Sequence, residues 1–97
     1  MITHILLWNY RDEVAPEARA AIEAELAALP ARVPAIASLT SGPVFRWRTR
    51  AYSHAAVFQF ADRAALDAYQ ADPQHRDFTA RFHPATSELV AVDYESA

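Results

Sequence analysis

The sequence predicts one α+β domain that spans residues 1–97. Three observations support this fold class. Four apolar segments of strand length are separated by segments with helical periodicity. Prolines and typical N-capping residues stand at the boundaries between these segments. The composition, 53% hydrophobic and 22% charged, is that of a globular chain of single-domain size.

The first part of the chain predicts a strand followed by a helix. Residues 3–10 form an aromatic-rich apolar run, which favours a strand. Pro16 then suits the first turn of a helix. One apolar stripe of this helix has spacings of four, four and three residues: Ala18, Ile22, Leu26 and Leu29. We expect Pro30 and Pro34 to end the helix.

The middle of the chain predicts two more strands, over residues 35–41 and 52–60. Between them, residues 43–51 alternate apolar side chains with Arg46, Arg48 and Arg50. This alternation is typical of a solvated edge strand or an ordered loop. Recruitment of an anionic group, such as a phosphopantetheine carrier, is the alternative interpretation.

The last part predicts a broken helix and a final strand. Asp62 is a candidate N-cap for a helix over residues 63–71, and Asp72 for a second helix over residues 73–82. Residues 88–94 form the last apolar run. The resulting order, β-α-β-β-α-β, is the ferredoxin-like arrangement.

Both faces of the predicted sheet are largely apolar. Side chains of either parity are mostly hydrophobic over residues 3–10, 52–60 and 88–94. An antiparallel sheet with one solvated face alternates instead, and the helices of two right-handed crossovers cover one face only. We therefore predict a homodimer in which two sheets pack face to face and form an α+β barrel.

The bulk composition excludes several classes of protein. A net charge of −3 lacks the basic footprint of a nucleic-acid binder. The absence of cysteine excludes disulfides and thiolate metal sites. No apolar run approaches the roughly 18 residues of a membrane span, and the N-terminal segment lacks a signal-peptide pattern. We expect a cytoplasmic protein with neither a nucleic-acid nor a membrane partner.

Four polar side chains are candidates for a site between sheet and helices: His4, His54, Tyr69 and His75. His75 and Tyr69 lie on the apolar faces of their helices. His4 and His54 open their strands with inward parity, so we expect all four to converge at one end. The expected apolar wall is Leu6, Trp8, Ile22, Leu26, Leu39, Phe58, Leu66, Phe78 and Leu89. Such a cavity is typical of a small-molecule site.

Five segments together form a pattern over nearly the whole chain: His4-Ile5-Leu6-Leu7, Leu29-Pro30 with Val33-Pro34, Tyr52-Ser53-His54, Tyr69 with Asp72-Pro73-Gln74-His75, and Val92-Asp93-Tyr94. This pattern resembles the stress-responsive A/B barrel (Dabb) family, which implies a dimeric α+β barrel. The family includes small polyketide cyclases such as olivetolic acid cyclase. Their resemblance implies Tyr69 and His75 as a catalytic pair, with His4 and His54 as pocket residues.

The chemistry of the pair suggests a cofactor-free cyclase. A buried imidazole is poised near neutral pH, so His75 is our candidate for the base that removes a proton between two carbonyls of a polyketide-like ligand. The Tyr69 hydroxyl would orient the ring or donate to the enolate. Two other functions stay open. One is a non-catalytic stress-associated dimer or small-ligand binder. The other is a cofactor-independent monooxygenase, which rests on fold analogy alone.

Each candidate residue also has a structural interpretation. His75 can hold the helix break, Tyr69 can belong to the core, and His4 and His54 can fasten neighbouring strands. Imidazoles suit zinc or copper, but no carboxylate or familiar spacing accompanies the histidines, so we expect no metal. We interpret His83 as the exposed end of a helix.

Overall fold

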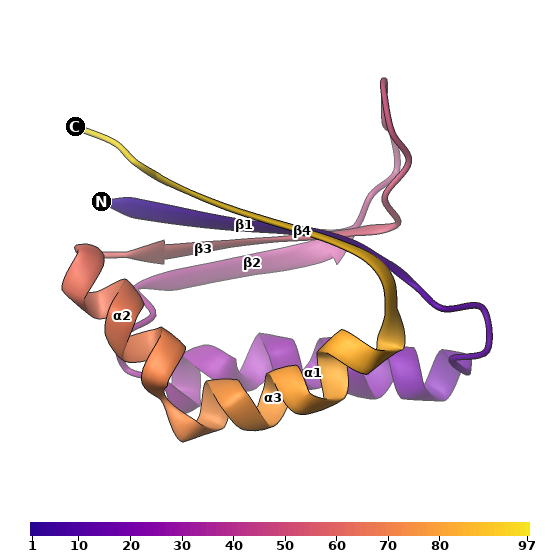
Figure 1. The fold of residues 1–97 in the computed structure, drawn as a ribbon, viewed down its shortest axis with the longest axis horizontal. Helices are drawn as coiled ribbons and strands as arrows, with labels where there is room; N and C mark the ends of the chain where they lie inside the picture. The colour runs from indigo at the N-terminus through magenta and orange to yellow at the C-terminus, as the bar shows by residue number, and fades with distance from the viewer.

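The computed structural model describes all residues 1–97 as a four-stranded antiparallel sheet with three helices on one face (Figure 1). The strands are β1 (Ile2–Tyr10), β2 (Ser38–Pro43), β3 (His54–Phe60) and β4 (Thr86–Glu95). The helices are α1 (Pro16–Arg32), α2 (Arg63–Ala71) and α3 (Pro73–Ala85). The predicted α+β class and β-α-β-β-α-β order are confirmed, with the second helix divided in two. None of the helices combines the length and hydropathy that crossing a membrane requires.

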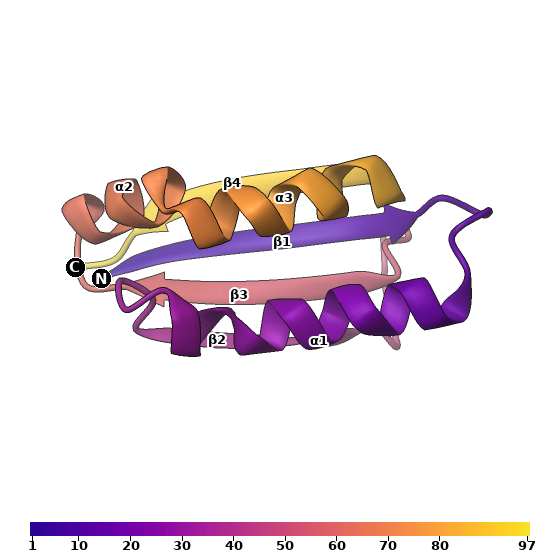
Figure 2. The ribbon, with the colours of Figure 1, turned by 90° about the horizontal axis from the view of Figure 1, so that it is seen from below.

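The sheet has the strand order β2-β3-β1-β4. β1 therefore pairs with β3 on one side and with β4 on the other, and both pairings are antiparallel. Figure 2 shows that α1 runs beneath β2 and β3, whereas α3 runs beneath β1 and β4. The helices thus form one layer, and the opposite face of the sheet has no cover within the chain.

Side chains of β1 alternate between these two faces. His4, Leu6 and Trp8 point to the helices and are buried, whereas Ile5 and Leu7 point to the uncovered face and are half-buried. Sixteen buried hydrophobic residues from the sheet, the helices and their connections form one core cluster. The site described below lies at one edge of this core.

Proline does not end the helices where the sequence predicts. α1 continues through Pro30 to Arg32. A proline in the last turn removes only one backbone donor, and the N–H of Val33 closes the helix by donating to the Leu29 carbonyl at 2.8 Å. α3 likewise continues through Pro84. α1 therefore runs past Pro30 but ends before Pro34, and α3 ends at Ala85 rather than at the predicted residue 82.

The break between α2 and α3 follows the predicted caps. The Asp62 carboxylate accepts from the backbone N–H of Ala65 at 2.8 Å, and Asp72 accepts from that of Gln74 at 2.8 Å. Asp72 has extended backbone angles, and Pro73 follows it at the first position of α3. The chain therefore bends here, between the last turn of α2 and the first turn of α3.

The segment between β2 and β3 is an arm, residues 44–53, that contains no helix or strand. It rises from the sheet on the side opposite the helices (Figure 1). β2 starts at Ser38 rather than at residue 35, because Ile36 is buried in the core as part of the preceding connection. β3 starts at His54, and β4 starts at Thr86, two residues before its predicted limit.

Replacement of Leu26 by Ala tests the core. Leu26 is fully buried (0% exposed), so we expect the free energy of unfolding to fall by about 2–5 kcal/mol. Urea denaturation at a fixed protein concentration measures this loss. Glu17→Ala, on the exposed side of the same helix, should change it by less than about 0.5 kcal/mol. Equal losses for the two variants would contradict the assignment of this helix face.

Candidate functional site

The bend between α2 and α3 brings Tyr69 and His75 into contact. Their ring centroids are 4.1 Å apart, with an angle of 45° between the planes. Tyr69 is almost fully buried, and His75 is half-buried. The ring of His4, on β1, has its centroid 6.1 Å from that of Tyr69. Three elements thus each contribute one polar aromatic side chain to the same place.

These three side chains line a cavity of about 220 Å³. Its walls are His4, Leu6, Tyr69, Gln70, His75, Phe78, Thr79, Phe82, His83, Leu89 and Ala91. Gln70, His83 and Ala91 are exposed, so the cavity opens to solvent at its rim. Because an apolar cavity of roughly 150 Å³ holds benzene, this one has room for about one six-membered ring with short substituents.

Burial tunes the imidazole of His75. Loss of hydration lowers the pKa of His75 below its ordinary value of 6.5, and the positive charge that His4 and His83 can carry acts in the same direction. The backbone of Gln70 partly offsets this lowering, although Nδ1 of His75 is buried without a hydrogen bond of good geometry. The ring is therefore neutral at pH 7 and able to accept a proton.

Burial also shifts the pKa of Tyr69, but upward rather than downward. Loss of hydration raises the pKa of the Tyr69 hydroxyl far above its ordinary value, and the nearby negative charge of Asp93 raises it further. The hydroxyl consequently keeps its proton over the whole physiological range and can serve only as a neutral donor or acceptor. The cavity thus contains a neutral base beside a neutral hydrogen-bond donor.

Asp93 is a member of this cluster that sequence reasoning missed. The register of β1 and β4 places it directly opposite His4, and its Oδ1 accepts a hydrogen bond from Nδ1 of His4. The carboxylate orients the imidazole, so that Nε2 is the nitrogen left for other partners. The shared inward parity of the two residues is visible in the sequence, but their pairing requires the strand register.

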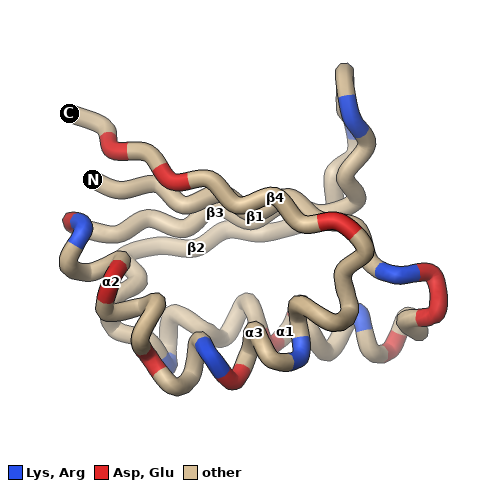
Figure 3. The backbone as a smooth tube through the Cα atoms, in the orientation of Figure 1, with Lys and Arg blue, Asp and Glu red and all other residues tan.

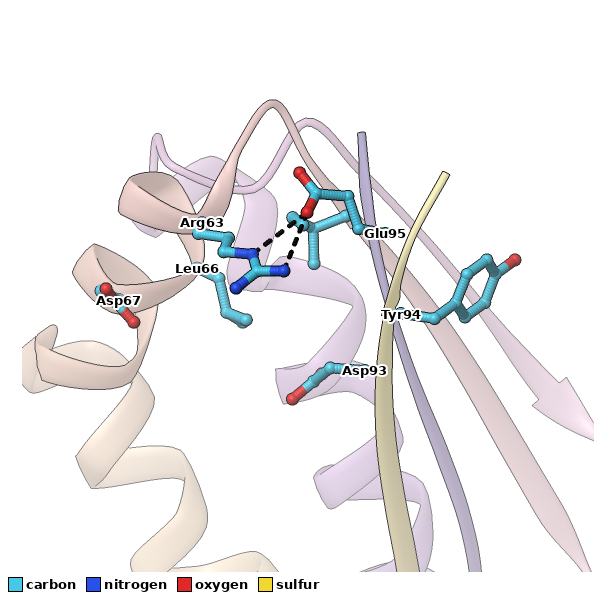
Figure 4. A pocket seen from close by; sticks show the side chains of 7 residues that line it. Arg63, Leu66, Asp67, Asp93, Tyr94 and Glu95 are labelled. Carbon is cyan, nitrogen blue, oxygen red and sulfur yellow. Dashed lines mark hydrogen bonds and ion pairs between the residues drawn. The ribbon is translucent and has the colours of Figure 1, made fainter. Parts of the chain in front are cut away.

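A second and larger cavity, of about 490 Å³, lies on the other side of Asp93. It is lined by Ile2, Arg63, Leu66, Asp67, Asp93, Tyr94 and Glu95. Figure 4 shows the Asp93 carboxylate pointing between β4 and α2, whereas the Tyr94 ring points away. Arg63 and Glu95 form an ion pair at 3.0 Å across this space. Four of its seven lining residues are charged and most are exposed, so this cavity leaves the Asp93 carboxylate open to water.

His54 does not join the other histidines, which corrects the expected convergence. β1 and β3 are antiparallel, so their first residues lie at opposite ends of the sheet: His54 pairs with Trp8, whereas His4 pairs with Phe58. His54 stacks on Trp8, with 5.6 Å between centroids, and its Nε2 lies 3.4 Å from Oε1 of Glu23 on α1. It therefore fastens β3 to α1. No three His, Cys, Asp or Glu side chains are grouped so that they could hold a metal ion.

A second polar cluster surrounds His54. The Tyr10 hydroxyl donates to Oε2 of Glu23 at 3.1 Å, and burial is the main cause that raises the pKa of Tyr10 to about 12. Ser53 Oγ lies 2.8 Å from Nδ1 of His54. None of these groups lines the cavity with Tyr69 and His75, and their contacts tie β1, β3 and α1 together.

The expected apolar wall is only partly the wall of the cavity. Leu6, Phe78 and Leu89 line it. Leu66 lines the larger cavity instead, and Leu39 packs against the edge of the core. The remaining four are buried in the packed core: Trp8, Ile22, Leu26 and Phe58. The sequence did not point to five lining residues, Gln70, Thr79, Phe82, His83 and Ala91. The inward face of α3, spaced by three and four residues from His75, is the signal that could have found most of them.

Comparison with known proteins supports the pattern seen in the sequence. The model of the stress-responsive A/B barrel domain (Dabb) family matches residues 2–96. The chain belongs to this family. The resemblance noted in the sequence is thereby confirmed, and so is the ferredoxin-like fold, which solved Dabb-family structures share. No curated protein matches the sequence significantly.

Three solved structures illustrate the similarity. A dimeric ferredoxin-like protein of unknown function from Thermobifida fusca is 28% identical, with a TM-score of 0.85 over 98% of this chain and 90% of its own. A protein of Arabidopsis thaliana is 22% identical, with a TM-score of 0.91 over 100% and 96% of the two chains. A hydroxynitrile lyase from Passiflora edulis is 21% identical, with a TM-score of 0.90 over 96% and 90%. At such identities the Arabidopsis and Passiflora proteins share the fold alone.

The pKa of His75 is directly measurable by NMR titration of the histidine ring protons, with the His75 signal assigned by its loss in His75→Gln. We expect a midpoint below 6.5, because burial disfavours the charged ring. The unfolded chain then binds more protons than the folded one between the two pKa values. The contribution of His75 to the free energy of unfolding should therefore fall as the pH drops below 6.5. A midpoint at or above 6.5 would contradict this account.

Proposed function

We propose that this Dabb-family protein is a cofactor-free acid–base enzyme that closes a ring in a small polyketide-like molecule. The observation that carries the proposal is the contact of the Tyr69 and His75 rings, 4.1 Å between centroids, inside a cavity that opens to solvent. A neutral base and a neutral donor side by side are the two groups that enolate chemistry requires.

The proposed reaction is an aldol-type ring closure. His75 removes the acidic proton between two carbonyls of a linear poly-β-ketone, and the Tyr69 hydroxyl donates a hydrogen bond to the enolate oxygen that forms. The enolate carbon then attacks a second carbonyl of the same molecule and forms the new C–C bond. The resulting alkoxide takes back a proton from the His75 imidazolium, so that the ring closes without gain or loss of electrons.

His4 and Asp93 supply a second imidazole to the same reaction. Asp93 holds Nδ1 of His4, which leaves Nε2 for the substrate. The His4 ring lies beside Tyr69 and lines the cavity. We assign His4 the role of orienting a substrate carbonyl, and Asp93 the role of positioning His4 and linking it to the solvent in the larger cavity.

The size of the cavity limits the substrate class. About 220 Å³ accepts roughly one six-membered ring with short substituents. Phe78, Phe82 and Leu89 give it apolar walls, which suit the carbon chain of such a molecule. A short polyketide that forms a single ring fits this space, whereas a chain that forms several fused rings does not.

The name of a structural relative supports catalysis at the level of the fold. The Passiflora edulis protein is a hydroxynitrile lyase, which supports the idea that this scaffold can house an enzyme without identifying the reaction. A small-ligand binder would use the same cavity but would not need an imidazole and a phenol ring in mutual contact. That contact favours the enzyme over the binder.

The reaction is testable with a linear poly-β-ketone thioester of single-ring length. Such compounds cyclise spontaneously to lactones, so the measured quantity is the yield of carbocyclic product by chromatography and mass spectrometry. We expect the wild-type protein to raise this yield. His75→Ala and Tyr69→Phe should each lower the catalysed rate by about 10²-fold or more, in line with the usual contribution of acid–base groups.

His54→Gln is the matched control, because this histidine lies at the other end of the layer and does not line the cavity. It should keep the catalysed rate within about threefold. Folded His75→Ala protein that retains the wild-type rate would overturn the assignment of the base.

We further propose that the working form is a homodimer joined through the uncovered face of the sheet. The half-buried Ile5, Leu7 and Val57 and the exposed Val92 and Tyr94 form this face. Helices cover only the opposite face. The Thermobifida fusca relative is described as dimeric, which supports a dimer for this chain.

A charge on the uncovered face should prevent this association. Val92 is 49% exposed in the single chain, so Val92→Asp should fold but remain monomeric in sedimentation velocity runs at micromolar concentration, where the wild type is a dimer. The control Ala64→Asp places the same charge at the exposed start of α2 and should leave the dimer intact. A dimeric Val92→Asp protein would contradict this interface.

A further inference from the structure

The arm, residues 44–53, exposes two large aromatic side chains. Phe45 is 89% and Trp47 is 58% exposed. A side chain of this kind can bury roughly 150–250 Å². Together, the two therefore leave about 200–350 Å² of mainly apolar surface in water. This is comparable with the largest apolar patch of a typical monomer. The core needs neither side chain, so their exposure calls for a partner.

The arm has a fixed base. The N–H of Val44 donates to the Ser53 carbonyl at 2.8 Å and joins the two limbs. Asn9 on β1 accepts from the N–H of Ser53 and donates to the Ala51 carbonyl. Arg50 pairs with Glu88 on β4 at 2.8 Å. The tip is therefore held in a defined direction rather than hanging from a loose loop.

That direction is away from the helices, on the side of the uncovered sheet face. Figure 1 shows the arm standing above the sheet, and in the perpendicular view of Figure 2 it recedes behind the start of β3. The other large side chains that are exposed are Met1, Val92 and Tyr94, of which the last two lie on the uncovered face. The arm and this face thus lie on the same side of the sheet.

The length of the arm decides how far it reaches. Sheets that pack face to face are about 10 Å apart. Each limb contains five residues, which span up to about 17 Å when extended. If a second copy lies on the uncovered face, the tip of the arm can pass beyond the interface and reach the flank of the partner.

The distribution of charge also favours a second copy as the occupant. β1, β2 and β3 contain no Lys, Arg, Asp or Glu, and Figure 3 shows charge on the sheet only along β4. Such a surface suits another apolar sheet. Of the arm's three arginines, Arg50 is paired within the chain, whereas Arg46 and Arg48 form no ion pair and can stay solvated at the rim of an interface.

We propose that the arm clasps a second copy of this chain, with Phe45 and Trp47 packed against the flank of the partner's sheet. This proposal rests on the sheet-face dimer. It gives a function to a segment whose alternating pattern had suggested a solvated edge or a site for an anionic group. In the dimer each subunit would hold the other at both ends of the interface.

Trp47 is an intrinsic probe of the clasp. The protein has two tryptophans, and Trp8 is buried (1% exposed) within the subunit. Dilution of the wild-type dimer should therefore shift the fluorescence emission to longer wavelength as Trp47 becomes exposed. The Trp47→Phe variant, which keeps only Trp8, should show no such shift. Emission from Trp47 that stays at a solvent-exposed wavelength in the dimer would overturn the proposal.

The aromatic pair can also be tested by affinity. Phe45→Ser with Trp47→Ser should raise the dimer dissociation constant by about 30-fold or more in sedimentation equilibrium, since two aromatic anchors are lost. The matched control is Arg48→Ser with Thr49→Ser, two exposed residues of the same arm, which should change it by less than about threefold. Circular dichroism verifies that both double variants are folded.

The outcomes separate the clasp from the sheet-face dimer. An unchanged dissociation constant in the aromatic variant, together with a monomeric Val92→Asp protein, would overturn the clasp and leave the sheet interface standing. That result would favour the alternative interpretation, in which the arm recruits an anionic group. Wild-type protein that remains monomeric at all concentrations would overturn both.

Discussion

The alternation of side chains along β1 is the constraint on which the rest of the structure depends. β1 is hydrogen-bonded on both edges, to β3 and to β4. Its register with these strands therefore sets which of their side chains point to the helices. His4 and Trp8 are thereby directed to the helices, and Ile5 and Leu7 to the uncovered face. A slip of one residue would exchange the two sets. Such a slip would remove His4 from the cavity and bury the wrong surface, so the core and the site depend on the same register.

The break between α2 and α3 adds the second half of the site. A single helix would carry Tyr69 and His75 on faces about 120° apart around its axis, because they are six residues apart and each residue turns the helix by about 100°. The Asp72 cap and Pro73 change the direction of the chain between them. The two rings then meet at 4.1 Å. A simple capping interaction, worth about 1 kcal/mol in a typical helix, thus contributes to a ring contact that continuous helical geometry would not give.

The uncovered sheet face and the arm hold the apolar surface that stays exposed in the single chain. A chain of 97 residues buries a limited share of its surface when it folds alone. Apolar residues remain on the outer side of β1, β3 and β4, and two aromatic residues of the arm remain exposed. These surfaces lie on one side of the molecule, whereas the cavity with Tyr69 and His75 lies on the other side of the sheet. The residues proposed for association and those proposed for chemistry are therefore different and can be mutated separately.

The sequence by itself determined the features that rest on neighbours close along the chain. These include the order of the elements, the caps at Asp62 and Asp72, and the pairing of Tyr69 with the Pro73–His75 segment, because capping and helix breaking act within one turn. Only the tertiary structure decided which distant residues meet. His4 finds Asp93, 89 positions away, through the register of β1 and β4, and His54 is excluded because antiparallel strands begin at opposite ends of a sheet. The same holds for the walls of the cavity. Ile22, Leu26 and Phe58 have the parity of lining residues, but close packing of the whole core leaves no space beside them.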